Sequence, residues 1–179
     1  MTSADDIVIR DWKPSDAAAL ATNLNHPEVV RYLGETIPFP YTIRHARVFI
    51  GMTNCCENKL AKAIVVNDEV VGSISLTPKD DIFRLDAELG FFLGKNHWGK
   101  GIMHRAIQKM TRFAFENFDL VRIHCQVIEE NLQSIKVLQK AGFKQEGILR
   151  NAAFKDGQLM NTCLMSILRA ELFPLRSDS

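Results

Sequence analysis

The richest concentration of residues that can do chemistry is the stretch GKNHWGKGIMHRA, residues 94–106. Its three glycines stand among lysine, histidine and arginine side chains, although the whole chain has a formal net charge of only +1. Glycine lets the main chain approach an anion closely, and the first N–H groups of a following helix are unpaired and point at it. No carboxylate occurs between Glu88 and Glu116. The stretch therefore predicts a phosphate-binding loop, with a tight turn before a solvated basic helix face as the structural alternative.

Two familiar phosphate motifs do not fit this loop. A P-loop needs Ser or Thr after its Gly-Lys pair, and here Lys100 is followed by Gly101. A dinucleotide fingerprint needs a third glycine where His104 stands, and it belongs in the first strand–helix unit of a chain. What remains is a strand, a short Gly-x-Gly loop and a helix.

The elements that must position this loop lie on both sides of it along the chain. The run 84–94 predicts a strand that bends near Gly90, and 122–128 predicts another. A helix over 131–142 has Asn131 as its N-cap and Gly142 just past its C-terminus. The end of the chain predicts a hairpin that turns at Asp156-Gly157. The helix after the loop has one apolar face, made of Met103, Ala106, Ile107, Met110, Phe113, Ala114 and Phe118.

The first part of the chain predicts a strand, three helices and a hairpin. The strand is 7–12, and the first helix is 14–25 with Ser15 or Asp16 as its cap. A short helix ends at Gly34, a third runs from Thr42 to about Glu57, and 61–76 forms a hairpin around Asn67-Asp68. With the later elements, this order predicts a mixed α/β fold with helices on both faces of the sheet.

Composition narrows the class of protein. A length of 179 residues with 46% hydrophobic and 24% charged residues predicts a single soluble domain spanning 1–179. The balanced charge gives no case for nucleic acid or a membrane surface as partner, and no run is apolar enough for a membrane span. Four cysteines without CxxC spacing favour reduced thiols and a cytoplasmic location, and the five histidines show no metal-ligand spacing, so we expect no metal.

Three motifs in order resemble the GNAT superfamily of acetyl-CoA-dependent N-acetyltransferases. They are AELGFFL, HWGKGI and NLQSIKVLQKAGFKQEGILR, strongest over 85–150 within a resemblance that spans about 7–170. The pattern is similar to the branch that acetylates the N-terminal alanine or serine of ribosomal proteins. The resemblance implies the GNAT fold, a mostly antiparallel sheet of six to seven strands that is splayed in the middle. It also implies acetyl-CoA as co-substrate.

The resemblance also implies which residues bind coenzyme A. The pantetheine arm would pair with the backbone of Phe91, Phe92 and Leu93, and Asn131 would meet it from the opposite side. The pyrophosphate would lie on backbone amides of a continuous segment: His97, Trp98, Gly99, Lys100, Gly101 and Ile102.

The sequence departs from the family pattern at several positions. Asn96 stands where Gln or Arg is usual, three residues before the first motif glycine. Many members carry a tyrosine acid where this chain has Leu138, whereas the ribosomal-protein branch has a serine at the position of Ser134. Some members of that branch also have a glutamate base where this chain has Ala153.

Acetyl transfer to an amine needs a neutral amine and a proton for the departing thiolate. An α-amine, with an ordinary pKa of about 8, needs less help to lose a proton than a lysine amine, at about 10.4. Glu88 is the candidate base, with simple pairing to a cation as the alternative, and Ser134 is the candidate acid, with local backbone bonding as the alternative. His124 and the cysteines Cys125 and Cys163 are expected to be packed in the core.

The leading function is therefore an N-acetyltransferase acting on a primary amine, such as a protein N-terminus, in a ternary complex. A small amine, either a polyamine or an antibiotic, is the second interpretation, and a non-catalytic acyl-CoA-binding module is the third. The acceptor pocket is expected from residues 30–42 and 150–162, whose irregular sequence does not reveal the substrate. Exposed terminal strands would allow a homodimer.

Overall fold

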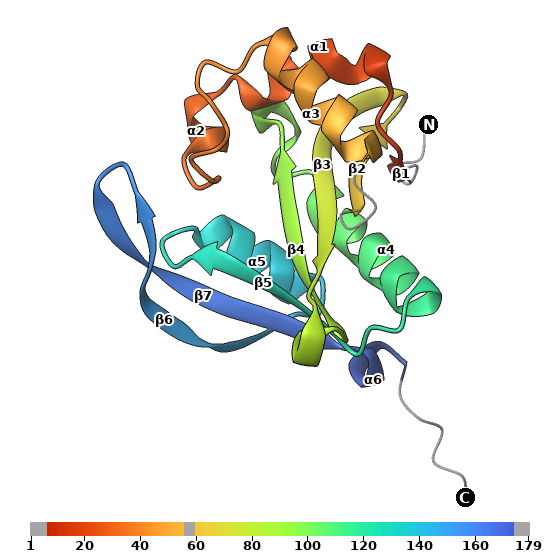
Figure 1. Cartoon of the computed structure of the whole chain (residues 1–179), viewed down its shortest axis with the longest axis vertical. Coiled ribbons are helices and arrows are strands. Elements are labelled where there is room, and N and C mark those ends of the chain that lie inside the picture. The colour runs from red at the N-terminus through yellow and green to blue at the C-terminus, as the bar shows by residue number, and fades with distance from the viewer. Residues whose placement is uncertain (1–6, 56–59, 174–179) are drawn as a thin grey trace, which may run out of the picture. The chain divides into compact units, whose positions relative to one another are not determined.

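The structure of the chain, a computed structural model, describes residues 7–55 and 60–173 (Figure 1). The strands are β1 (Ile7–Arg10), β2 (Leu60–Val66), β3 (Glu69–Pro78), β4 (Asp86–Leu93), β5 (Arg122–Ile128), β6 (Lys144–Lys155) and β7 (Gln158–Leu168). The α-helices are α1 (Ala17–Leu24), α2 (Pro27–Val30), α3 (Ile43–Cys55), α4 (Ile102–Asn117), α5 (Leu132–Lys140) and α6 (Arg169–Leu172). Short 3-10 helices are η1 (Pro14–Asp16), η2 (Asp81–Phe83) and η3 (Lys95–His97).

The strands follow the order β1-β2-β3-β4-β5-β7-β6 in one seven-stranded sheet. The pairs β1–β2, β2–β3, β5–β7 and β6–β7 are antiparallel, whereas β4 and β5 are parallel. The parallel pairing joins residues 86–88 to 122–124, so it ends two residues before Gly90. The mixed, mostly antiparallel sheet expected from the sequence is confirmed.

The described chain divides into two compact units. The first contains the residues up to Leu76 together with Gly90–Ala106, and the second contains Thr77–Leu89 and the chain from Ile107 onward. The strands β3 and β4 and the helix α4 contribute residues to both units. The assignment of 1–179 to a single domain stays a prediction.

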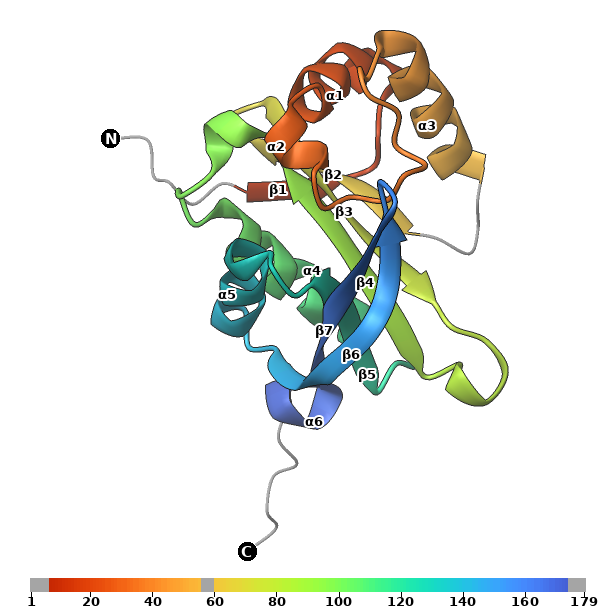
Figure 2. The same ribbon diagram turned by 90° about the vertical axis from the view of Figure 1, so that its left-hand side faces the viewer.

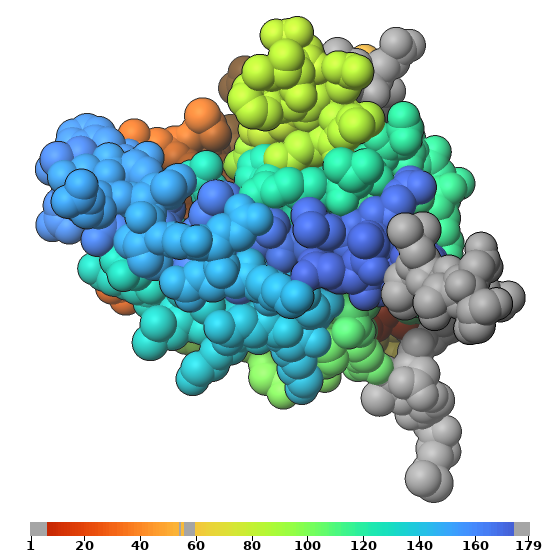
Figure 3. All heavy atoms as spheres, turned by 90° about the horizontal axis from the view of Figure 1, so that it is seen from below, coloured from red at the N-terminus to blue at the C-terminus, as the bar shows by residue number. Residues whose placement is uncertain are grey.

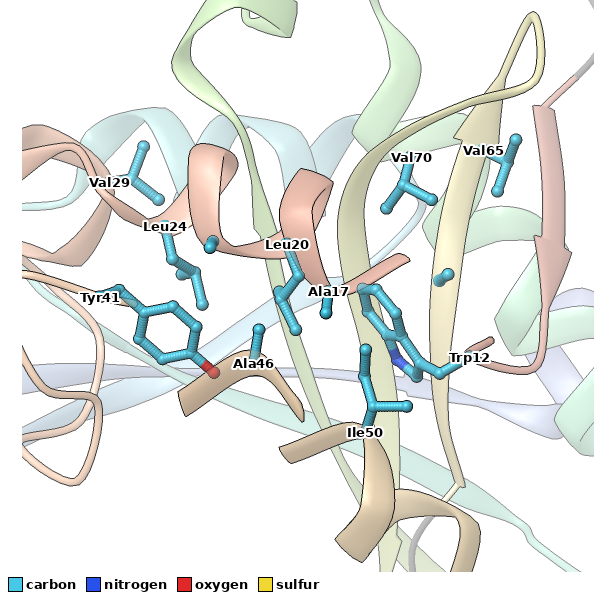
Figure 4. Close-up of a cluster of buried hydrophobic side chains, with 12 residues drawn as sticks. Trp12, Ala17, Leu20, Leu24, Val29, Tyr41, Ala46, Ile50, Val65 and Val70 are labelled. Atoms are coloured by element: carbon cyan, nitrogen blue, oxygen red, sulfur yellow. The ribbon is translucent and has the colours of Figure 1, made fainter. Parts of the chain in front are cut away.

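The core of the first unit forms where α1 and α3 pack with β2 and β3 (Figure 4). Leu20 of α1 and Ile50 of α3 are 1% and 3% exposed, and both belong to the same buried cluster as Trp12. Trp12 also meets Phe49 edge-on, with ring centroids 5.8 Å apart. Asp16, one of the two residues predicted to cap the first helix, occupies the N-cap position of α1. Its side chain makes no capping hydrogen bond. Its carboxylate instead accepts hydrogen bonds from Arg10 at 2.7 Å and from the backbone of Lys13 at 2.8 Å.

The second unit is built around the long β6–β7 hairpin, which Figures 1 and 2 show as a twisted ribbon. Its turn is at Asp156 and Gly157, with φ of 50° and 77°, as the sequence predicts. In Figure 3 the residues of β6 and β7 lie side by side as light and dark blue spheres and form one continuous face. The helix α5 packs on the same hairpin. Its core-facing side chains and those of β5 and β7 are apolar: Ile123, Cys125, Val127, Leu138, Cys163, Met165 and Ile167.

Two details of the helices differ from the expectation. The short helix α2 ends at Val30 rather than Gly34. Phe113 of α4 and Phe118, which directly follows this helix, are 44% and 40% exposed, whereas Phe115 of α4 is buried. The buried stripe of α4 extends toward Phe115, and the two exposed rings contact each other edge-on, with centroids 6.0 Å apart. Periodicity found the helix but misplaced the edge of its apolar face.

Candidate functional site

The glycine loop lies between β4 and α4 in the first unit, as predicted. Gly99 and Gly101 have φ of 75° and 69°, a left-handed conformation that other residues rarely adopt. A Cβ added at Gly99 would meet nothing within 4 Å, so its surroundings are open. The backbone N–H groups of Gly99, Lys100 and Gly101 donate to no other described residue. The loop therefore presents unpaired donors beside the start of a helix, which is the arrangement that binds phosphate.

The N–H groups of His97 and Trp98 are arranged differently. They donate to the carbonyls of Gly94 and Lys95 at 3.0 and 3.2 Å, and so close the η3 turn. The backbone donors that remain for an anion belong to the segment from Gly99 into the first turn of α4. Of the six predicted pyrophosphate amides, those of His97 and Trp98 are already paired, and the four from Gly99 to Ile102 remain.

The loop is fixed to the first unit by Trp98 and by a residue that the sequence did not suggest. The half-buried indole of Trp98 packs against the core and donates through Nε1 to the Leu93 carbonyl at 2.8 Å. Asn23 of α1 donates to the Val70 carbonyl at 2.7 Å and lies against Gly94, where an added Cβ would be 2.0 Å from its Oδ1. Only glycine fits at position 94, so the entrance to the loop has a fixed backbone path.

The basic charge of the loop is partly neutralised by residues distant in sequence. Lys95 pairs with Glu28 at 2.5 Å and holds the pKa of that carboxyl below its ordinary value, chiefly through the hydrogen bond. His97 Nε2 lies 3.7 Å from Glu69. Lys100 is exposed, beside the open glycines. The positive charge around the loop is therefore smaller in the folded protein than the run of basic residues in the sequence suggests.

The strand half that precedes the loop is also in the first unit. Phe91 and Phe92 are partly exposed, and Leu93 is buried. A Cβ at Gly72 of β3 would be 2.3 Å from the Phe92 carbonyl oxygen, so glycine at 72 allows β3 and β4 to come close. The Leu93 carbonyl is already engaged by Trp98. The nine predicted cofactor residues of 91–93 and 97–102 thus lie together in one unit.

Glu88 lies in the second unit and has a cation as its partner. Its carboxylate accepts from Lys79 Nζ at 2.7 Å, and the two side chains are 42% and 38% exposed. Ala87 and Leu89 are buried on the opposite face of β4, which confirms the predicted alternation. The ion pair is the alternative that the sequence left open, and the role of Glu88 as a base stays a prediction.

A chain of polar contacts crosses the strands of the second unit near Glu88. His124 Nδ1 lies 2.9 Å from Asp86, and Arg122 bonds to Asp86 at 2.5 Å and to Glu146 at 2.6 Å. Ser166 donates to the other Glu146 oxygen at 2.6 Å. His124 is buried, as expected, but its carboxylate partner was missed. The alternation of Asp86 with Glu88 and of Arg122 with His124 is the sequence signal that could have indicated a polar face.

Asn131 and Ser134 also belong to the second unit and meet each other. Asn131 Oδ1 accepts from the Ser134 backbone N–H at 3.2 Å, which confirms the predicted N-cap of α5. The Ser134 hydroxyl has no hydrogen-bond partner among the described residues. Leu138 is fully buried, so no proton donor stands at that position. Ala153 is half-buried opposite Met160 and offers no base.

The cysteines of the second unit are core residues, as predicted. Cys125 and Cys163 are 4% and 0% exposed. Burial, with a smaller contribution from the charge of Glu88, raises the pKa of Cys125 to about 12, and burial also raises that of Cys163. Because a thiolate is the nucleophilic form, neither residue is suited to forming an acyl-enzyme.

Within residues 7–55 and 60–173, no three His, Cys, Asp or Glu side chains form a group that could hold a metal ion. No helix in the same ranges is long and apolar enough to cross a membrane.

Comparisons with known proteins extend over nearly the whole chain. The family model for the acetyltransferase (GNAT) domain matches residues 6–144. The N-acetyltransferase p20 of Bacillus licheniformis, itself uncharacterised, is 33% identical over 171 residues, which cover 92% of this chain and 94% of that protein.

Solved structures share the fold at lower identity. RimL, described as a ribosomal L7/L12 alpha-N-protein acetyltransferase in complex with coenzyme A, superposes with a TM-score of 0.81 at 17% identity, over 92% of this chain and 94% of that one. Spermidine N-acetyltransferase from Vibrio cholerae, in complex with CoA and spermine, gives 0.78 at 18% identity, over 93% and 98%.

Proposed function

Because the chain belongs to the acetyltransferase (GNAT) domain family, we propose that this enzyme transfers the acetyl group of acetyl-CoA to a protein N-terminal α-amine. The amine attacks the thioester directly, in a ternary complex. Direct attack is supported by the burial of Cys125 and Cys163, the cysteines in the same unit as Glu88, because a buried thiol with a raised pKa is unsuited to carrying the acetyl group.

The residues of the first unit fit the phosphates of coenzyme A. The open backbone donors of Gly99, Lys100 and Gly101 suit the pyrophosphate, and the exposed Lys100 adds a positive charge. The pantetheine arm would run along the backbone of Phe91 and Phe92. Asn131 would contact it while also capping α5, since a cap uses only one of the two polar atoms of the amide.

The observation that carries the choice of acceptor is the pairing of the carboxylates in the second unit. Glu88 pairs with Lys79, and both Asp86 and Glu146 pair with Arg122. A polyamine is a polycation and needs carboxylates that are not already compensated. An α-amine carries at most one charge and, with a pKa of about 8, is partly neutral at cellular pH. These three carboxylates share two cations, which leaves one negative charge for a polycation, and this favours an N-terminus over spermidine.

The proton balance assigns two roles. The N–C bond forms, the C–S bond breaks, the amine gives up protons and the thiolate of coenzyme A takes one. Glu88 is the carboxylate that receives the amine proton, which requires it to separate at least partly from Lys79. The unpartnered hydroxyl of Ser134 would donate to the thiolate, since Leu138 has no proton to give.

Release of free coenzyme A from acetyl-CoA across a panel of amines tests this proposal. The panel contains peptides that begin with serine or alanine, the same peptides with a blocked N-terminus, spermidine and an aminoglycoside. We expect release with the open peptides alone. Release with spermidine alone would reverse the choice of acceptor. Coenzyme A binding in calorimetry without release on any amine would favour the non-catalytic module.

The state of the cysteines is the basis on which we propose a cytoplasmic location for the protein. The described cysteines Cys55, Cys125 and Cys163 are free thiols, which suits a reducing cytoplasm.

A further inference from the structure

The polar face of the second unit contains a histidine that the proposed mechanism has not used. In the parallel register of β4 and β5, Asp86 lies beside Arg122 and Glu88 lies beside His124. Residues in register on neighbouring strands share a face, and neighbouring strands lie about 4.8 Å apart. Glu88 and His124 are therefore side by side on this face, whereas Ala87 and Ile123 are fully buried on the other.

The contact with Asp86 fixes the tautomer of His124. An ionised carboxylate only accepts hydrogen bonds, so the ring nitrogen 2.9 Å from Asp86, Nδ1, carries the hydrogen. The lone pair of the neutral ring is then on Nε2. Among the described residues, the buried side-chain nitrogen and oxygen atoms without a hydrogen-bond partner belong to Trp12, His26 and Thr111. Nε2 of His124 is not among them, so it is not a buried atom that lacks a partner. The ring therefore presents a proton acceptor on the side away from Asp86.

Asp86 is itself held in place. One of its oxygens receives Nδ1–H of His124, and the other receives Arg122 at 2.5 Å. Arg122 in turn bonds to Glu146, which accepts from Ser166, the β7 residue in register with His124. An imidazole oriented by a carboxylate that is fixed by further bonds is the arrangement found where histidine moves protons.

We propose that His124 is a proton-relay residue, which takes the amine proton from Glu88 at Nε2 and passes it to solvent. The inference rests on the proposed acetyl transfer and deepens its proton step. The amine N–H proton moves to the Glu88 carboxylate and then, through one water or a rotation of the Glu88 side chain, to Nε2. The ring returns to its neutral form when that proton leaves to water. Asp86 is the positioning residue: it accepts the Nδ1 hydrogen, so that the lone pair of the neutral ring lies on Nε2.

The proton affinities of the groups explain why a relay helps. The ordinary pKa values are about 8 for an α-amine, 4.3 for glutamate and 6.5 for histidine, so Glu88 alone is a poor resting place for the proton. Transfer onward to histidine is downhill from glutamate. The charged groups that face the ring are Asp86 and Glu88 of β4, Glu146 of β6 and Arg122 of β5. Lys79, which directly follows β3, pairs with Glu88.

Kinetics on a serine-starting peptide with acetyl-CoA test the relay. His124→Gln keeps a donor for Asp86 but cannot take a proton, so kcat near pH 7 should fall by about 10²-fold with KM unchanged for both substrates. The loss should shrink above pH ~8, where the amine is already neutral. Because the two residues act in series, the double variant Glu88→Gln with His124→Gln should lose no more of kcat than Glu88→Gln alone. An unchanged pH profile in His124→Gln, or losses that multiply in the double variant, would overturn the relay.

A second measurement on the wild-type chain needs no acceptor. Nitrogen NMR of histidine-labelled protein, assigned with His124→Gln, should show the neutral His124 ring as the Nδ1–H tautomer. A ring that holds its hydrogen on Nε2 has no acceptor to offer and would also overturn the relay. If no peptide is acetylated while the tautomer is Nδ1–H, the proposed acceptor is wrong and the relay geometry stands.

Discussion

At the residue scale, Asn131 combines a structural and a binding role that a single substitution can separate. Its Oδ1 caps α5 by accepting from the Ser134 backbone, which also fixes the position of the proposed acid. A cap of this kind is worth about 1 kcal/mol. The rest of the amide is available to a ligand.

We therefore predict that Asn131→Ala lowers the free energy of unfolding by about 1 kcal/mol and weakens coenzyme A binding. Denaturant unfolding and calorimetry measure the two effects. Asn131→Asp keeps the capping oxygen and serves as the matched control, with stability close to the wild type. Loss of stability in Asn131→Ala with unchanged coenzyme A affinity would reduce the residue to a helix cap.

At the element scale, the segment between β4 and α4 works through its backbone rather than its side chains. Gly99 has φ of 75° and open surroundings, so the effect of a side chain there comes from backbone strain and from the blocked approach of an anion. The turn of the β6–β7 hairpin offers a matched glycine. Gly157 has φ of 77°, and an added Cβ there also meets nothing within 4 Å.

Gly99→Val should weaken coenzyme A binding strongly, whereas Gly157→Val should leave it unchanged. Both variants strain a left-handed backbone, so both should lose similar stability. Calorimetry with coenzyme A and thermal unfolding of each variant separate binding from strain. Equal coenzyme A affinities in the two variants would contradict the assignment of the loop.

The strands of the second unit are joined by Glu146, and this contact predicts a dependence of stability on pH. Hydrogen bonds from Ser166 and then Arg122 hold the pKa of Glu146 below its ordinary value. A carboxyl with a lowered pKa in the folded protein stabilises it above the ordinary value, about 4.3, and this stabilisation is lost as the pH falls through the lowered value. Its side chain is 40% exposed, so solvent screening keeps the effect modest.

Glu146→Gln should therefore lower the free energy of unfolding at pH 7 and narrow its gap to the wild type at pH 3. Urea unfolding at the two pH values measures this. Glu130→Gln, an exposed carboxylate without an ion pair among the described residues, is the control and should follow the wild type. A gap that stays constant between pH 7 and pH 3 would show that the Glu146 charge does not matter.

At the scale of the whole molecule, the sequence predicted what depends on local pattern. Positive φ at Asn67 and Asp156 confirms both hairpin turns, and the cap and end of α5 follow from Asn131 and Gly142. The contact of Asp86 with His124 joins residues 38 positions apart and depends on the register of two parallel strands, which spacing alone does not reveal.

The side of α4 that carries Phe113 was misjudged for a related reason. Which aromatic ring is buried depends on what packs against the helix, and Phe115 was chosen by that packing rather than by periodicity. The partner of Glu88 could not be predicted for the same reason, since Lys79 reaches Glu88 from the residue just after the end of β3. Local sequence patterns were enough to locate the loop and the helices. The ion pairs around the proposed base depend on contacts between strands, which local patterns do not reveal.

The central claim, acetylation of an N-terminal α-amine, is tested most directly on one peptide that carries both a free N-terminus and an internal lysine. The peptide is incubated with the enzyme and acetyl-CoA near pH 7, and tandem mass spectrometry locates the added acetyl group. The account predicts a single acetyl group on the α-amine, because an α-amine is partly neutral at this pH and a lysine amine, with a pKa of about 10.4, is not. Acetylation of the lysine, or transfer to spermidine in a parallel reaction while the peptide stays unmodified, would contradict it.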